Sequence, residues 1–112
     1  MSAELDAVLG ALADPTRRAV IGVLGKRPLR SGEIASTLET SRPAMSRHLR
    51  VLRRAGLVEE SSLDEDARGR VYRLRPQRFA ELRGWLDEVE AFWGDQLAGF
   101  KAHAESRGRK RR

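Results

Sequence analysis

The chain contains no cysteine, and this absence excludes several kinds of site. Without a thiol, none of its 112 residues can form a disulfide bond, a thiolate metal ligand or a thiol redox sensor. It also lacks an apolar run of membrane-spanning length, and the segment from Met1 to Asp6 lacks the basic and apolar regions of a signal peptide. We therefore expect a cytoplasmic protein that makes no contact with a membrane.

The sequence also lacks the residue arrangements on which catalysis depends. No pair of polar residues has catalytic spacing, and there is no glycine-rich phosphate loop. Ser46 and His48 are only two residues apart in a predicted helix, so their side chains do not face each other. The sequence therefore predicts neither enzymatic activity nor a bound cofactor.

The positive charge of the chain is concentrated in two places. The net charge is +6, but residues 107–112 hold five of the 22 basic residues, which leaves 17 basic and 16 acidic residues elsewhere. We expect residues 1–105 to form one domain and residues 106–112 to form a disordered basic tail. Within the domain, five arginines and no carboxylate lie between Thr40 and Val58, which predicts a local positive surface of the kind that faces nucleic acid.

Apolar residues recur at helical spacing in five segments of the chain. Asp14 and Pro15 mark the start of the second segment and Ser41 the start of the fourth, because Asp and Ser cap helix N-termini and Pro suits the first helical turn. The predicted helices cover residues 4–13, 15–24, 31–38, 41–55 and a long final segment from residue 76 onward. The side chains expected to face the core from the second, third and fourth helices are Ala19, Val20, Val23, Leu24, Ala35, Leu38, Met45, Leu49 and Leu52.

Two short segments with strand character follow the fourth helix. Residues 57–61 and 70–74 contain β-branched or aromatic side chains, and they flank the polar turn 62–69. Together the elements predict a mainly α fold with a β-hairpin wing over residues 58–74, made of about five helices and two strands. This order of elements is typical of a winged helix-turn-helix domain.

The third and fourth helices have the spacing of a helix-turn-helix, whose second helix enters the major groove of DNA. Arginine presents a planar fork that matches both guanine and phosphate, and short hydroxyl groups can donate to phosphate. Two other interpretations stay open, namely a winged-helix module that docks onto another protein and an RNA-binding protein. The arginine-rich helix disfavours docking, and an aromatic content of only 5% disfavours base stacking on RNA.

Four segments are similar to the ArsR/SmtB family of bacterial winged-helix repressors. They are residues 14–18 (DPTRR), 32–35 (GEIA), 46–58 (SRHLRVLRRAGLV) and 69–74 (GRVYRL). The resemblance covers roughly residues 5–100, and it implies a homodimer, joined through the first and last helices, that binds a palindromic operator in double-stranded DNA and represses transcription. The resemblance implies that DNA bases are contacted by Arg42, Ala44 and Arg47. It implies that phosphates are contacted by Ser41, Ser46, His48 and Arg50. The wing residues that it implies at the DNA are Arg68 and Arg70.

The final helix carries an apolar stripe that a body of this size is too small to cover. We expect the uncovered part to form a dimer interface together with the first helix, and the alternative is that the stripe packs within one chain. The residues expected at this interface are Leu5, Val8, Leu9, Leu86, Val89, Phe92, Trp93, Leu97 and Phe100.

The chain departs from the metal-sensing members of the family that it resembles. Residues 32–38 hold no cysteine where those members place metal ligands, and His103 has only Asp95 and Glu105 as possible partners. Because zinc generally takes four ligands, we expect no metal site. The sequence identifies no small-molecule effector.

Overall fold

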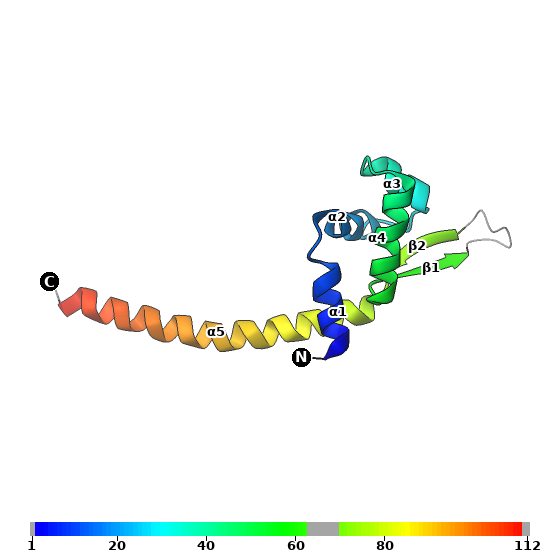
Figure 1. Cartoon of the computed structure of the whole chain (residues 1–112). Helices are drawn as coiled ribbons and strands as arrows, with labels where there is room; N and C mark the ends of the chain where they lie inside the picture. The colour runs from blue at the N-terminus through cyan, green and yellow to red at the C-terminus, as the bar shows by residue number, and fades with distance from the viewer. Residues whose placement is uncertain (1, 63–69, 111–112) are drawn as a thin grey trace. The chain divides into compact units, whose positions relative to one another are not determined.

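The computed structural model describes residues 2–62 and 70–110 of the chain. In this part of the chain the elements are α1 (Ala3–Ala11), α2 (Pro15–Leu24), α3 (Ser31–Thr37), α4 (Arg42–Arg54), β1 (Val58–Ser62), β2 (Arg70–Leu74) and α5 (Pro76–Lys110) (Figure 1). The order of helices and strands is the predicted one. The contacts within the chain divide it into two units, Met1–Glu81 and Leu82–Arg112, and the second unit consists of the larger part of α5.

Side-chain caps fix where the helices of the first unit begin. The Asp14 carboxylate accepts a hydrogen bond from the backbone N–H of Arg17 at 3.0 Å, and Pro15 occupies the first position of α2. The Ser41 hydroxyl accepts from the backbone N–H of Ala44 at 3.3 Å and starts α4 in the same way. Both caps were predicted from the residue types alone, because a short oxygen-bearing side chain satisfies the free N–H groups of the first turn.

Helix α4 is the centre of the first unit. It packs against α1, α2, α3 and β1, and Figure 1 shows it between α2 and the hairpin. Met45, Leu49 and Leu52 form its inner face and are at most 1% exposed, as the helical spacing predicts. The core around them is completed by Leu5, Val8, Ala11, Val20, Leu24, Leu29, Ile34, Ala35, Ala55, Leu57, Val58 and Val71.

The predicted core positions of α2 and α3 are partly wrong. Ala19 is exposed, and Val23 is only half-buried, because the buried stripe of α2 is centred on Val20 and Leu24. In α3 the fully buried residue is Ile34, which was not predicted, while Leu38 lies at the end of the helix and is half-buried. A helix of two turns offers too few positions for spacing alone to determine which side faces the core.

The connection between α2 and α3 adds a contact to the hairpin that was not predicted. Leu29 forms a β-bridge with Tyr72, in which the Leu29 N–H donates to the Tyr72 carbonyl at 3.1 Å and the Tyr72 N–H donates to the Leu29 carbonyl at 2.8 Å. The Leu29 side chain is buried. This bridge fastens the start of α3 to β2.

Gly56 ends α4 in a conformation that favours glycine. Its φ is +77°, its N–H donates to the carbonyl of Arg53, and the N–H of Leu57 donates to the carbonyl of Leu52. This pair of hydrogen bonds is the Schellman motif that closes a helix C-terminus. A Cβ atom at Gly56 would lie 2.9 Å from Cγ of Arg78.

We expect Gly56→Ala to lower the free energy of unfolding by about 1–2 kcal/mol, because an L-residue is strained at a left-handed φ. Chemical denaturation of the purified protein measures this loss. Gly22→Ala is the matched control, because Gly22 lies within α2 and a Cβ atom there would meet nothing within 4 Å. The control should be neutral or more stable by up to about 1 kcal/mol, and an equal denaturation midpoint for the two variants would contradict the prediction.

The second unit exposes large apolar side chains along α5. Phe92 and Trp93 are 60% and 56% exposed, and their rings make an edge-to-face contact with centroids 5.6 Å apart. Leu86, Leu97 and Phe100 are also exposed. The backbone of α5 is helical as far as Lys110, so residues 106–110, expected in a disordered tail, belong to the helix. Of the helices in the described residues, none combines the length and apolar character needed to cross a membrane.

Candidate nucleic-acid interface

Helices α3 and α4 form a helix-turn-helix with a tight connection. At the end of α3 the N–H of Glu39 donates to the carbonyl of Ser36, and the N–H of Thr40 donates to the carbonyl of Ala35. Glu39 has a φ of +52°, which reverses the chain direction within the turn. Ser41 then caps α4, so only the residues from Leu38 to Ser41 separate the two helices.

Helix α4 is divided into a buried face and an exposed face. The inner face is anchored in the core by Met45, Leu49 and Leu52. The outer face of α4, as the term is used below, consists of the exposed residues Arg42, Ser46, Arg47 and Arg50. Arg53 and Arg54 in the last turn of the helix are exposed as well. Ala44 is half-buried near the N-terminal end. The fold therefore holds a row of cationic and hydroxyl groups on a helix that cannot rotate without breaking the core.

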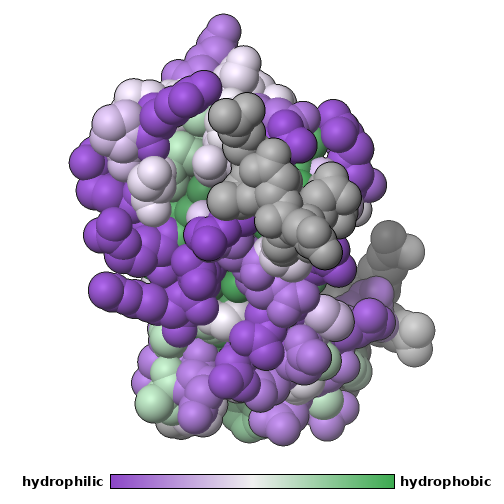
Figure 2. Space-filling view, turned by 90° about the vertical axis from the view of Figure 1, so that its right-hand side faces the viewer, coloured by the Kyte–Doolittle hydropathy of each residue, from purple (hydrophilic) through white to green (hydrophobic). Residues whose placement is uncertain are grey.

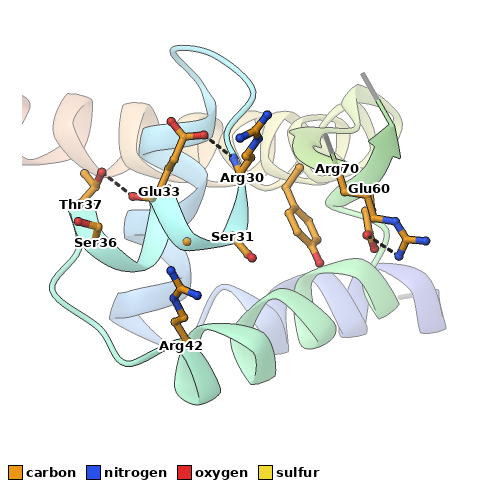
Figure 3. Close-up of a pocket in the computed structure, with 10 residues that line it drawn as sticks. Arg30, Ser31, Glu33, Ser36, Thr37, Arg42, Glu60 and Arg70 are labelled. Atoms are coloured by element: carbon orange, nitrogen blue, oxygen red, sulfur yellow. Dashed lines mark hydrogen bonds and ion pairs between the residues drawn. The ribbon is translucent and has the colours of Figure 1, made fainter. Parts of the chain in front are cut away.

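A groove runs beside the N-terminal end of α4. It has a volume of about 780 Å³ and lies between α3, the first turn of α4 and the hairpin (Figure 3). The Arg42 side chain extends from α4 toward α3, with its guanidinium close to Gly32. The other residues that line the groove are Arg30, Ser31, Glu33, Ser36, Thr37, Glu60, Arg70 and Tyr72.

The hairpin brings its charged side chains next to the end of α4. Its strands are antiparallel, with Glu60 opposite Tyr72. The Glu60 carboxylate lies 3.0 Å from an Arg53 guanidinium nitrogen and 3.3 Å from an Arg70 guanidinium nitrogen. Burial and the charge of Glu60 raise the pKa of the Tyr72 hydroxyl. Arg68, the other predicted wing residue, lies outside the described residues.

His48 is the predicted contact whose surroundings differ most from expectation. Its side chain is half-buried, and its Nδ1 lies 3.9 Å from Oδ1 of Asp14 at the start of α2. The backbone N–H of Arg17 is the main cause that lowers the pKa of the Asp14 carboxyl, with the charges of Arg17 and His48 contributing. His48 therefore has a partner inside the protein, and its predicted contact with a DNA phosphate stays a prediction.

Asp14 should make the stability of the protein depend on pH. A carboxyl whose pKa is lower in the folded than in the unfolded chain stabilises the fold above its unfolded pKa, and this contribution is lost as pH falls through the folded pKa. The stability difference between the wild type and Asp14→Ala should be largest near pH 7 and should shrink below the ordinary value of 3.8.

Urea denaturation at a series of pH values measures this difference. Asp14→Asn is the control, because asparagine keeps the oxygen that accepts from Arg17 but carries no charge. It should retain most of the stability at pH 7 and lose less on acidification than the wild type. If the difference in free energy of unfolding between the wild type and Asp14→Ala is the same at pH 3 and pH 7, the lowered pKa of Asp14 in the folded protein is contradicted.

The face of the molecule that carries the hairpin is largely hydrophilic. Figure 2 looks onto this end, where hydrophilic side chains cover most of the described surface and apolar areas are small and separated. Such a surface suits a charged, hydrated partner better than an apolar one.

Three comparisons identify the family. A protein family described as a helix-turn-helix domain matches residues 12–61 of the chain. The transcriptional regulator Rv2034 of Mycobacterium tuberculosis is 44% identical over 98 residues, which are 88% of this chain and 86% of that protein. The structure of an ArsR-like transcriptional regulator from Rhodococcus sp. RHA1 is 32% identical, with a TM-score of 0.72 over 88% of this chain and 91% of the other. The chain belongs to the ArsR family.

A further relative of this ArsR-family protein is the transcriptional repressor SdpR of Bacillus subtilis. It is 34% identical over 53 residues, which are 47% of this chain and 59% of SdpR. The similarity to Rv2034 and to the ArsR-like regulator from Rhodococcus confirms the family resemblance found in the sequence. The chain is a transcriptional regulator with a winged helix-turn-helix DNA-binding fold and is not an enzyme.

Two features of the ArsR-family site complete its description. Within the residues that the structure describes, no group of three or more His, Asp or Glu side chains is placed to hold a metal ion. The pairing of Glu60 with Arg53 and Arg70 was not found in the sequence, although two adjacent glutamates in a strand that follows an arginine-rich helix are a visible signal for it.

Proposed function

We propose that this ArsR-family regulator is a homodimeric repressor that binds a palindromic operator. Helix α4 enters the major groove, and the hairpin lies along the adjacent DNA backbone. The observation that carries the proposal is the outer face of α4, on which arginine and serine side chains are exposed while the opposite face of the same helix is buried in the core. A helix held in this way can place its side chains at defined base pairs.

The outer face of α4 contains groups suited to bases and groups suited to phosphates. Arg42 and Arg47 can each donate two hydrogen bonds to guanine, and the methyl group of Ala44 can contact thymine. The Ser41 hydroxyl accepts from the N–H of Ala44, which leaves its hydrogen free to donate to a phosphate. The remaining phosphate contacts come from Ser46, His48 and Arg50, with Arg68 and Arg70 from the wing.

The exposed apolar residues of α5 support a dimer. Leu86, Phe92, Trp93, Leu97 and Phe100 are 49–74% exposed, and a second copy of the chain would remove them from water. Val89 and Leu9 are half-buried, so each keeps part of its surface available to a partner. Leu5 and Val8 were expected there as well, but they are 6% and 0% exposed within one chain, so they serve its core and offer no surface to a partner.

Repression is the mode of regulation that we propose. SdpR, whose name describes a repressor, is similar to this chain over 53 residues. A dimer that covers a promoter excludes other proteins from it. The alternative of a protein-docking module finds less support, because the end of the molecule that carries the hairpin is hydrophilic.

Footprinting and fluorescence anisotropy on DNA from the promoter of the chain's own gene test the proposal. We expect protection of two half-sites whose centres are about 34 Å apart. A duplex of equal length and scrambled sequence, the control, should bind far more weakly, by a factor of about 10³ or more. Equal affinity for both duplexes would contradict operator recognition. If transcription in vitro from the bound promoter is unchanged, repression is contradicted but operator recognition is not.

A further inference from the structure

Two arginines from different elements meet at one carboxylate beside the DNA-facing surface. Arg53 comes from the last turn of α4 and Arg70 from the start of β2. Their guanidinium nitrogens lie 3.0 Å and 3.3 Å from the two carboxylate oxygens of Glu60, one on each oxygen. The Glu60 side chain is only 18% exposed, whereas the Arg53 and Arg70 side chains are 52% and 63% exposed. The carboxylate is thus enclosed between two cations that themselves reach the solvent.

This arrangement has the chemistry of a phosphate site. Arginine binds carboxylate and phosphate oxygens through the same planar set of N–H donors. A DNA phosphate next to the hairpin would therefore bind the same two guanidinium groups that form ion pairs with Glu60. Figure 3 shows Glu60 and Arg70 together on the hairpin side of the groove, with Arg42 on the α4 side.

We infer that Glu60 is a specificity-determining residue that competes with DNA phosphate for Arg53 and Arg70. In the free protein its carboxylate pairs with both arginines and cancels one of their two positive charges. A duplex without the operator sequence offers only phosphates, so its binding must displace Glu60 without help from base contacts. Operator binding is supported in addition by base contacts along α4 and can leave the ion pairs of Glu60 in place, so Glu60 weakens non-specific binding more than operator binding. This inference rests on the proposed function, because it assumes that the hairpin faces DNA.

Removal of the Glu60 charge tests the inference. Glu60→Gln keeps the size and the hydrogen-bonding oxygen of the side chain but leaves both arginines free of a carboxylate. We expect its affinity for a non-operator duplex to rise on the order of tenfold at low salt, since released arginines can displace further counterions from DNA. The slope of log K against log salt should become steeper by about 0.9 for each additional phosphate contact.

Glu59→Gln is the matched control. Glu59 is the preceding residue of β1, its carboxylate is 48% exposed, and its ion pair is with Arg75 at 3.8 Å. The control therefore removes the same charge from the same strand without releasing Arg53 or Arg70. Fluorescence anisotropy of both variants on operator and non-operator duplexes should give a lower ratio of operator to non-operator affinity for Glu60→Gln than for Glu59→Gln.

The outcomes separate this inference from the proposed function. If the wild type distinguishes the operator but Glu60→Gln behaves like Glu59→Gln or binds more weakly, only the inference is overturned. If the wild type binds no duplex, the proposed function is overturned and the inference with it. A double variant, Arg53→Gln with Arg70→Gln, gives a second measurement. In that background Glu60→Gln should change the affinity no more than Glu59→Gln does, and a larger change would also overturn the inference.

Discussion

Replacement of Leu97 by glutamate should leave the protein monomeric and weaken operator binding by a factor of about 10² or more. Leu97 is 64% exposed and lies between Trp93 and Phe100 in the series of exposed apolar residues on α5. A carboxylate at this position would lose its hydration in the dimer without gaining a partner. A monomer contacts one half-site only, and linking two binding modules commonly raises affinity by about 10²–10⁴.

Light scattering coupled to gel filtration gives the oligomeric state, and anisotropy on the operator gives the affinity. Ala91→Glu is the control, because Ala91 is exposed on the same helix and the helical period places it on the side away from the apolar residues, so the substitution introduces the same charge outside the expected interface. The control should remain dimeric. A dimeric Leu97→Glu variant would show that the subunits meet elsewhere, and a monomeric variant with full operator affinity would show that one copy suffices.

Replacement of Arg47 by alanine should remove recognition of one base pair in each half-site. Arg47 is exposed on the outer face of α4, near the N-terminal end of the helix, which enters the major groove in the proposed complex. The loss of an arginine that donates two hydrogen bonds to guanine costs about 1–3 kcal/mol in discrimination against the wrong base. Competition binding with operators mutated at each base pair should show reduced selectivity at one symmetric position.

Arg54→Ala is the control for Arg47→Ala. Arg54 is exposed on the same helix seven residues further on, about 10.5 Å along the axis, and the substitution removes the same charge. The Arg54→Ala variant should bind all DNA sequences more weakly than the wild type, by a similar small factor for each sequence. If Arg47→Ala also weakens all sequences equally, then Arg47 contacts a phosphate and not a base.

Local signals in the sequence predicted the elements of the fold well. Asp14 and Ser41 act as caps within three residues of their partners, and Met45, Leu49 and Leu52 share one side of a helix long enough for the period to be read. These features depend on neighbours in the chain, so residue type and spacing are sufficient to find them.

The features that the sequence did not predict depend on residues far apart in the chain. The bridge between Leu29 and Tyr72 and the pairing of Glu60 with Arg53 and Arg70 join separate elements. Contacts between distant parts of the chain also decide which of the predicted interface residues are exposed. An apolar side chain is visible in the sequence, but whether its own chain or a second copy covers it is decided by tertiary packing. Leu5 and Val8 are covered by their own chain, and Leu97 is not.

The two faces of α4 have a consequence for how such regulators diversify. The residues that hold the helix in place are separate from those that point outward, although they alternate along the same thirteen residues. Substitutions on the outward side can change the preferred DNA sequence at little cost in folding stability, since surface substitutions usually alter it by less than about 0.5 kcal/mol. After gene duplication, one copy can therefore acquire a new set of target genes through a few point mutations, while the inherited core keeps both copies folded.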